Sequence, residues 1–91
     1  MNTYIIYYDL YNPGQNFSKL VNLIKSYPLW ARLGGSAYII GTKDTTVSVR
    51  DNLQSVLYNN DKLFVGMIKA PAAWIGIGDE VSQWLRNNLK S

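Results

Sequence analysis

The residue whose type and position most directly suggest chemistry is Asp9. It follows the strand-like run 4–8 (YIIYY) and precedes the turn-forming residues 12–14 (NPG). A carboxylate at the end of a central strand suits a hard divalent cation such as Mg²⁺ or Mn²⁺, because these ions prefer oxygen ligands. A metal held there would activate water for attack on a phosphodiester. The alternative is that Asp9 caps the following turn, as Asp commonly does.

A second set of side chains has the chemistry of nucleic-acid contact. Arg32 can hold a phosphate through a two-pronged fork, and Ser36 can donate one more hydrogen bond. Tyr8 and Tyr38 can stack on unpaired bases if an open sheet face binds a single strand, and Lys19 can neutralise a phosphate. The alternative is structural: the cations are solvated, Ser36 begins a strand, and the tyrosines pack in the core or at an interface.

Composition restricts the chemistry further. The chain has no Cys and no His, which excludes disulfides, Cys or His zinc ligands, Cys nucleophiles and His general bases. Nine Lys and Arg residues against six Asp and Glu residues give a net charge of +3. A mild basic excess permits nucleic-acid binding without requiring it.

The balance of apolar and charged residues predicts a homodimer. The 91 residues fit a single domain, and they are 47% hydrophobic and only 16% charged. Average domains are about 25% charged. So much apolar surface on a small chain is expected to be buried partly between subunits.

Hydropathy predicts no contact with a membrane. No apolar stretch approaches the roughly 18 residues that a membrane span needs. The N-terminus lacks the charged region and apolar run of a signal peptide. We therefore expect a cytoplasmic protein.

Periodicity and turn signals predict the order β, α, β, β, α, β over the first 69 residues. The expected elements are a strand over 3–9, a helix over 16–27, strands over 30–33 and 36–40, a helix from an Asp44 N-cap to about 58, and a strand over 63–68. This is the ferredoxin-like arrangement, an α+β fold with two helices on one face of an antiparallel sheet. Its other face is expected to be open and apolar, which is a second reason to predict a dimer through the sheet.

The last part of the chain, residues 70–91, is expected to extend this core. Residues 71–77 fit either a short strand or a packed loop. Asp79 is the expected cap of a final helix whose apolar stripe holds Val81, Trp84 and Leu85. The sequence leaves open whether this helix packs on its own subunit or on a partner.

Two segments resemble a known family. They are 4–10 (YIIYYDL) and 32–38 (RLGGSAY). Both are similar to the small adaptation protein that is the second of the CRISPR-associated proteins. Virulence-associated protein D shares its fold and first-strand acid, and short bacterial chains labelled SinR-like are similar over most of their length.

The second segment matches only in part. Arg32, Ser36 and Tyr38 keep the register of that family, whereas Gly34 stands where Gln is usual. The resemblance covers roughly the first two-thirds of the chain, and its motifs are short. The tail does not match the usual C-terminal strand of the family.

The resemblance implies a symmetric dimer in which the two copies of Asp9 face each other. It implies either one shared divalent metal and phosphodiester hydrolysis, or a structural clamp for duplex DNA that does not need the acid. For this chain, the sequence leaves open whether DNA or RNA is bound. A third hypothesis is a regulatory or toxin-type dimer that binds a protein partner. The modest charge, Gly34 and the Trp-containing tail favour this third class.

Overall fold

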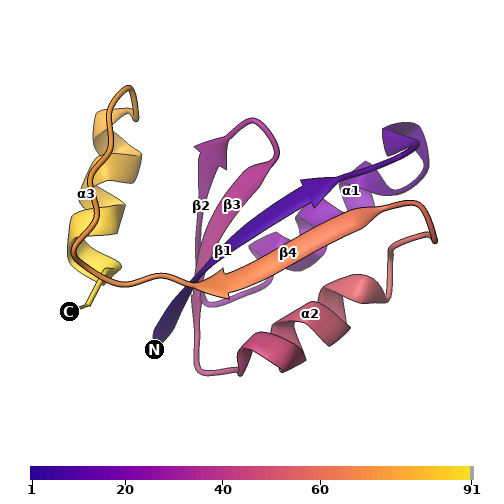
Figure 1. The fold of residues 1–91 in the computed structure, drawn as a ribbon, viewed down its shortest axis with the longest axis horizontal. Helices are drawn as coiled ribbons and strands as arrows, with labels where there is room; N and C mark the ends of the chain where they lie inside the picture. The colour runs from indigo at the N-terminus through magenta and orange to yellow at the C-terminus, as the bar shows by residue number, and fades with distance from the viewer. Residues whose placement is uncertain (91) are drawn as a thin grey trace.

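The sheet of the computed structural model, which describes residues 1–90, is arranged around its first strand. The elements are β1 (Asn2–Asp9), α1 (Pro13–Lys25), β2 (Leu29–Gly34), β3 (Ala37–Thr42), α2 (Thr46–Gln54), β4 (Lys62–Met67) and α3 (Asp79–Asn88). The strand order is β2-β3-β1-β4, and every neighbouring pair is antiparallel (Figure 1). This confirms the expected α+β fold with its βαββαβ order and an added C-terminal helix.

Alternation along β1 sends side chains to both faces of the sheet. Tyr4, Ile6 and Tyr8 point to the face that α1 and α2 cover, where they are at most 5% exposed. They pack there with Leu20 and Leu53, one from each helix. This face holds the larger part of the core, and each of its large buried side chains adds about 1.5–3 kcal/mol of stability.

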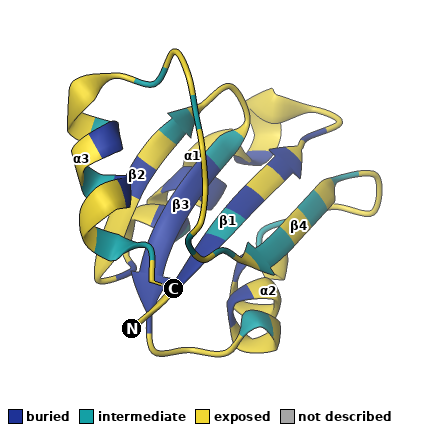
Figure 2. Ribbon diagram, turned by 60° about the vertical axis from the view of Figure 1, so that its left-hand side comes forward, coloured by how far each residue is buried: buried dark blue, intermediate teal, exposed yellow. Residues whose placement is uncertain are grey.

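The other face of the sheet is partly covered by the C-terminal segment, which corrects the expectation of an open face. Ala31, Ile39 and Leu85 are the buried residues of a second cluster there. Its partly buried members are Ile5, Leu33, Ile68, Trp74, Ile77, Val81, Trp84 and Leu89. In Figure 2, α3 lies beside β2, with α1 behind the sheet. The final helix thus packs on the sheet of its own chain.

Polar contacts hold this C-terminal segment in place. The indole Nε1 of Trp74 donates to Ser82 Oγ at 3.1 Å, and Ser82 Oγ donates to the carbonyl of Ile77 at 3.1 Å. Thr3 Oγ1, on β1, donates to the carbonyl of Asn88 at 2.9 Å. The hydroxyl of the buried Ser82 is therefore paired, as buried polar groups require.

Several helix boundaries differ from those expected. α1 begins at Pro13, because proline suits the first helical position, where its missing N–H is not needed. Thr45, and not Asp44, is the N-cap of α2: Thr45 Oγ1 accepts from Ser48 N at 3.1 Å. Gly78 is the N-cap of α3, and Asp79 lies inside its first turn.

The end of β3 also differs from the one expected, because Gly41 lies within the strand. A Cβ at Gly41 would approach the side chain of Leu29 on β2 to 2.9 Å, so this position keeps the strands packed. Residues 71–77 form no strand, so of the two expected alternatives the packed loop is the correct one, with Trp74 and Ile77 in the second cluster.

The C-terminal segment is expected to contribute to folding stability through Leu85. Leu85→Ala should lower the free energy of unfolding by about 2–5 kcal/mol, because Leu85 is 4% exposed and its loss leaves a cavity. Ile75→Ala is the matched control, since Ile75 is 97% exposed in the same segment. Urea unfolding followed by circular dichroism measures both. Equal midpoints for the two variants would show that α3 is not docked.

Candidate nucleic-acid interface

Asp9 lies at the end of β1 on the face that α3 partly covers, and it is exposed. It pairs in register with Lys62 of β4. Within residues 1–90 the only salt bridge joins Arg50 to Asp51, and Asp9 caps no turn through a hydrogen bond. The carboxylate is therefore available to solvent.

The residues of one chain do not by themselves fit a divalent ion at Asp9. Among residues 1–90, no three His, Cys, Asp or Glu side chains lie close enough together to hold a metal. Calcium takes six to eight oxygen ligands and magnesium six, so one carboxylate would leave most positions to water or to a second copy of the chain. A site for Mg²⁺ or Mn²⁺ at Asp9 would thus need further oxygen ligands from water, a substrate phosphate or a second copy of the chain.

Tyr8 and Tyr38 are not available to stack on bases, which corrects that part of the expected site. They are 5% and 4% exposed, and their rings lie on the helix-covered face with centroids 6.4 Å apart. Burial raises the pKa of Tyr8, the neighbouring Tyr38 raises it further, and Arg32 opposes the shift. The two rings therefore form a buried support for more exposed residues.

Those exposed residues lie where α1 meets the edge strand β2. Phe17 and Trp30 are 43% and 41% exposed. The Phe17 ring contacts Tyr8 with centroids 6.2 Å apart, and the Trp30 ring contacts Tyr38 at 6.4 Å. The four rings thus form a row in the order Phe17, Tyr8, Tyr38 and Trp30, with the two exposed rings at its ends.

Two cations border this row. Lys25 Nζ lies 5.0 Å from the centre of the Trp30 ring, within the range of cation–π attraction. Arg32 pairs in register with Tyr38, and its Nη2 donates only a long 3.5 Å bond to the Gly35 carbonyl. We call Phe17, Lys25, Trp30 and Arg32 the α1–β2 border.

Ser36 and Lys19 lie outside this border. Ser36 is exposed in the β2–β3 turn, where its carbonyl accepts from Tyr8 N at 3.0 Å. Gly34 and Gly35 in the same turn have φ of 137° and 51°, values that L-residues with a Cβ rarely adopt. Lys19 is exposed on α1, but it is two residues from Phe17 and so roughly 200° around the helix from it.

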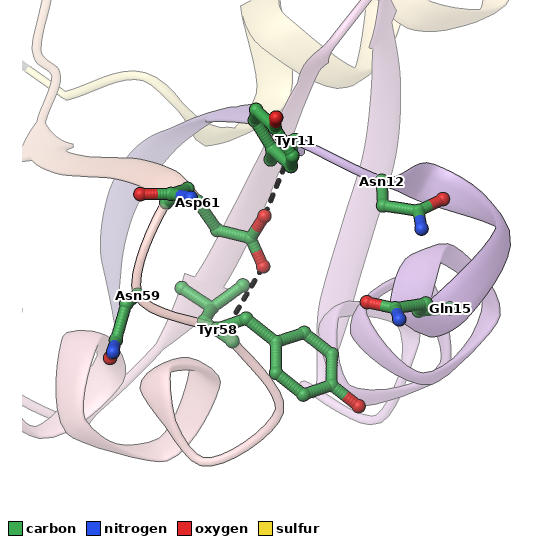
Figure 3. Close-up of a pocket in the computed structure, with 8 residues that line it drawn as sticks. Tyr11, Asn12, Gln15, Tyr58, Asn59 and Asp61 are labelled. Atoms are coloured by element: carbon green, nitrogen blue, oxygen red, sulfur yellow. Dashed lines mark hydrogen bonds between the residues drawn. The ribbon is translucent and has the colours of Figure 1, made fainter.

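Asp61 is a residue whose role the sequence did not indicate. Its Oδ1 accepts from Tyr11 N at 2.9 Å, and its Oδ2 accepts from Tyr58 N at 2.9 Å (Figure 3). Oδ2 also accepts from Asn16 Nδ2 at 2.8 Å. These bonds lower the pKa of Asp61, with the Tyr58 backbone bond as the largest cause. Asp61 thus ties the α2–β4 connection to Tyr11 and Asn16, which lie 50 and 45 residues earlier in the chain.

The partners of Asp61 line an open hollow of about 430 Å³ between the β1–α1 and α2–β4 connections. Figure 3 shows Tyr11, Asn12, Gln15, Tyr58 and Asn59 around the Asp61 carboxylate. The sequence identified residues 59–61 only as a turn, because the three bonds to Asp61 come from backbone and side-chain groups that no local pattern connects.

Comparison with known proteins identifies no relative: no protein-family model, curated protein or solved structure matches the chain. In the described residues, no helix is long and apolar enough to cross a membrane.

The bonds of Asp61 predict a pH-dependent contribution to stability. The folded-state pKa is lower than the unfolded one, so the contribution is complete above the ordinary carboxyl pKa of about 3.9 and disappears as the pH falls through the folded value. Asp61→Asn should lower the urea midpoint at pH 7, and the difference from the natural chain should shrink below about pH 4. Asp9→Asn is the control and should leave the midpoint unchanged. A difference for Asp61→Asn that stays constant down to pH 2 would contradict this role.

Proposed function

We propose that this chain binds single-stranded nucleic acid along the α1–β2 border. The observation that carries the proposal is the half-exposed Trp30, which has Lys25 5.0 Å from its ring centre and Arg32 two residues along the same strand face. Stacking platforms beside cations are how sequence-tolerant proteins hold single strands.

The aromatic part of the border supplies stacking surface. Phe17 and Trp30 each leave about two-fifths of their area exposed, while the rings behind them are buried. A ring held by packing loses little conformational entropy when a base stacks on it. Each stacked base contributes about 1–3 kcal/mol by alanine substitution.

The charged part of the border supplies phosphate contacts. Of the six acids, five lie in or beside α2 and α3 or in the α2–β4 connection, and Asp9 points to the opposite face of the sheet from Tyr8. Lys25 and Arg32 therefore meet a phosphate backbone without a neighbouring carboxylate on the border. The βαββαβ order is compatible with the resemblance to the CRISPR-associated family, some members of which are expected to clamp duplex DNA.

Substitution of the border should weaken binding of a fluorescently labelled single strand in anisotropy measurements. Trp30→Ala should reduce affinity roughly 5- to 150-fold through lost stacking. Arg32→Ala should reduce it and also lower the slope of log K against log salt by about 0.7, because one fewer counterion is released.

Arg86→Ala is the matched control. Arg86 also lies over an aromatic ring, 6.0 Å from the centre of Trp74, but in the C-terminal segment. It should leave affinity and salt slope unchanged. If all three variants bind like the natural chain, or if the natural chain binds neither DNA nor RNA at low salt, the proposal fails and the protein-interaction dimer becomes the better hypothesis.

A metal-dependent nuclease is the second candidate, and one feature favours it. Tyr7 and Phe64 are 47% and 59% exposed, and they pair in register two positions from the Asp9–Lys62 pair, on the same face of the sheet. This apolar patch is the part of the sheet face outside the α3 cluster. If two copies meet there, their Asp9 carboxylates converge, and a divalent ion would relieve the repulsion between them and activate water.

The nuclease hypothesis is tested by Asp9→Asn. It should abolish cleavage of single-stranded DNA or RNA in Mg²⁺ or Mn²⁺ while leaving the mass by light scattering at that of a dimer. Phe64→Ser, on the patch beside it, should reduce both the dimer and the cleavage. Undiminished cleavage by purified Asp9→Asn, or a natural chain with the mass of one subunit at micromolar concentration, would exclude this mechanism.

A further inference from the structure

We propose that the hollow beside Asp61 takes one unpaired nucleobase that carries an exocyclic amino group. This inference rests on the proposed single-strand binding and adds base preference to it. The hollow of about 430 Å³ is open to solvent and lies between the connection that leaves β1 and the connection that enters β4 (Figure 3).

The Asp61 carboxylate has one acceptor position left for such a group. Two carboxylate oxygens offer about four lone-pair sites, and the protein fills three of them. The remaining site is on Oδ1, which accepts only from Tyr11 N. The exocyclic amino group of adenine, cytosine or guanine can donate to this site. Thymine and uracil have no amino group and offer only the ring N3–H, which lies between two carbonyl oxygens that the carboxylate would repel.

The amide side chains around the hollow are free to read the rest of a base edge. Within the described chain, Asn12, Gln15 and Asn59 make no side-chain hydrogen bond to protein. Each amide offers both donors and acceptors, as the paired donors and acceptors of a base edge require.

The aromatic rings of the hollow face solvent. Tyr11 and Tyr58 are 77% and 56% exposed, and Figure 3 places them on opposite sides of the Asp61 carboxylate. No Lys or Arg lines this hollow, so its chemistry fits a neutral ring better than a phosphate.

The phosphate of the same nucleotide would lie in a neighbouring hollow. It measures about 360 Å³, shares Tyr58, Asn59 and Asp61 with the first, and adds Arg50. Arg50 bonds only to Asp51, at 2.9 Å, and both side chains are more than half exposed. Exposed pairs of this kind are weak, so the guanidinium can turn to a phosphate.

The hollow and the border lie at different sides of the first turns of α1. Gln15 lines the hollow, and Phe17, which begins the aromatic row, is two residues further along and so roughly 200° around the helix. A strand stacked on Phe17 therefore has to pass around the start of α1 to place another base beside Asp61.

The test compares a labelled deca-thymidine strand with the same strand carrying one central dA, by anisotropy with the full chain. The dA strand should bind about fivefold more tightly or better. Tyr58→Ala and Gln15→Ala should lower the affinity for the dA strand more than the affinity for deca-thymidine, and so remove that preference. Tyr7→Ala, an exposed tyrosine on the other sheet face, is the matched control and should keep the preference.

The experiments distinguish an error in the proposed binding at the α1–β2 border from an error in the proposed base site at Asp61. Trp30→Ala should weaken both strands equally. If the natural chain binds no strand at all, titration of adenosine monophosphate and thymidine monophosphate against the side-chain amide NMR signals of Gln15 and Asn59 decides the pocket alone. Shifts with the adenosine compound only support the proposal. Equal anisotropy affinities for the two strands would overturn it. So would NMR signals of Gln15 and Asn59 that shift with neither nucleotide, or that shift instead with free hexoses.

Discussion

The whole arrangement depends on β1 burying side chains on both of its faces. Tyr4, Ile6 and Tyr8 pack under α1 and α2, while Ile5 packs toward α3. Because successive residues of a strand point to opposite faces, this pattern fixes where the chemistry can lie. Tyr8 becomes a buried support of the α1–β2 border, and its neighbour Asp9 is sent to the opposite face of the sheet.

The C-terminal segment accounts for much of the apolar composition that predicted a subunit interface. A sheet face that is apolar throughout would predict a large subunit interface. Here α3 and the loop before it cover much of that face within one chain, around Ile39 and Leu85. What remains is the smaller patch of Tyr7 and Phe64 beside Asp9, so the case for a dimer rests on that patch and not on the whole face.

The strands could be predicted from the sequence because each has a clear alternation and a turn after it, as in Leu63 to Met67. The exposure of Tyr8 and Tyr38 could not, because alternation does not say which face the helices cover. The cap at Thr45 was missed because Asp44 is an equally good N-cap residue. Asp61 was missed because its three partners are separated from it in sequence by up to 50 residues.

The central claim is that the α1–β2 border, and not the C-terminal segment, meets nucleic acid. The three Trp residues give three indole N–H signals, and only Trp30 belongs to the border. Titration of the labelled chain with a short single strand should shift the Trp30 indole and leave those of Trp74 and Trp84 in place. Shifts confined to Trp74 and Trp84, or an unmoved Trp30 at saturation, would contradict the account.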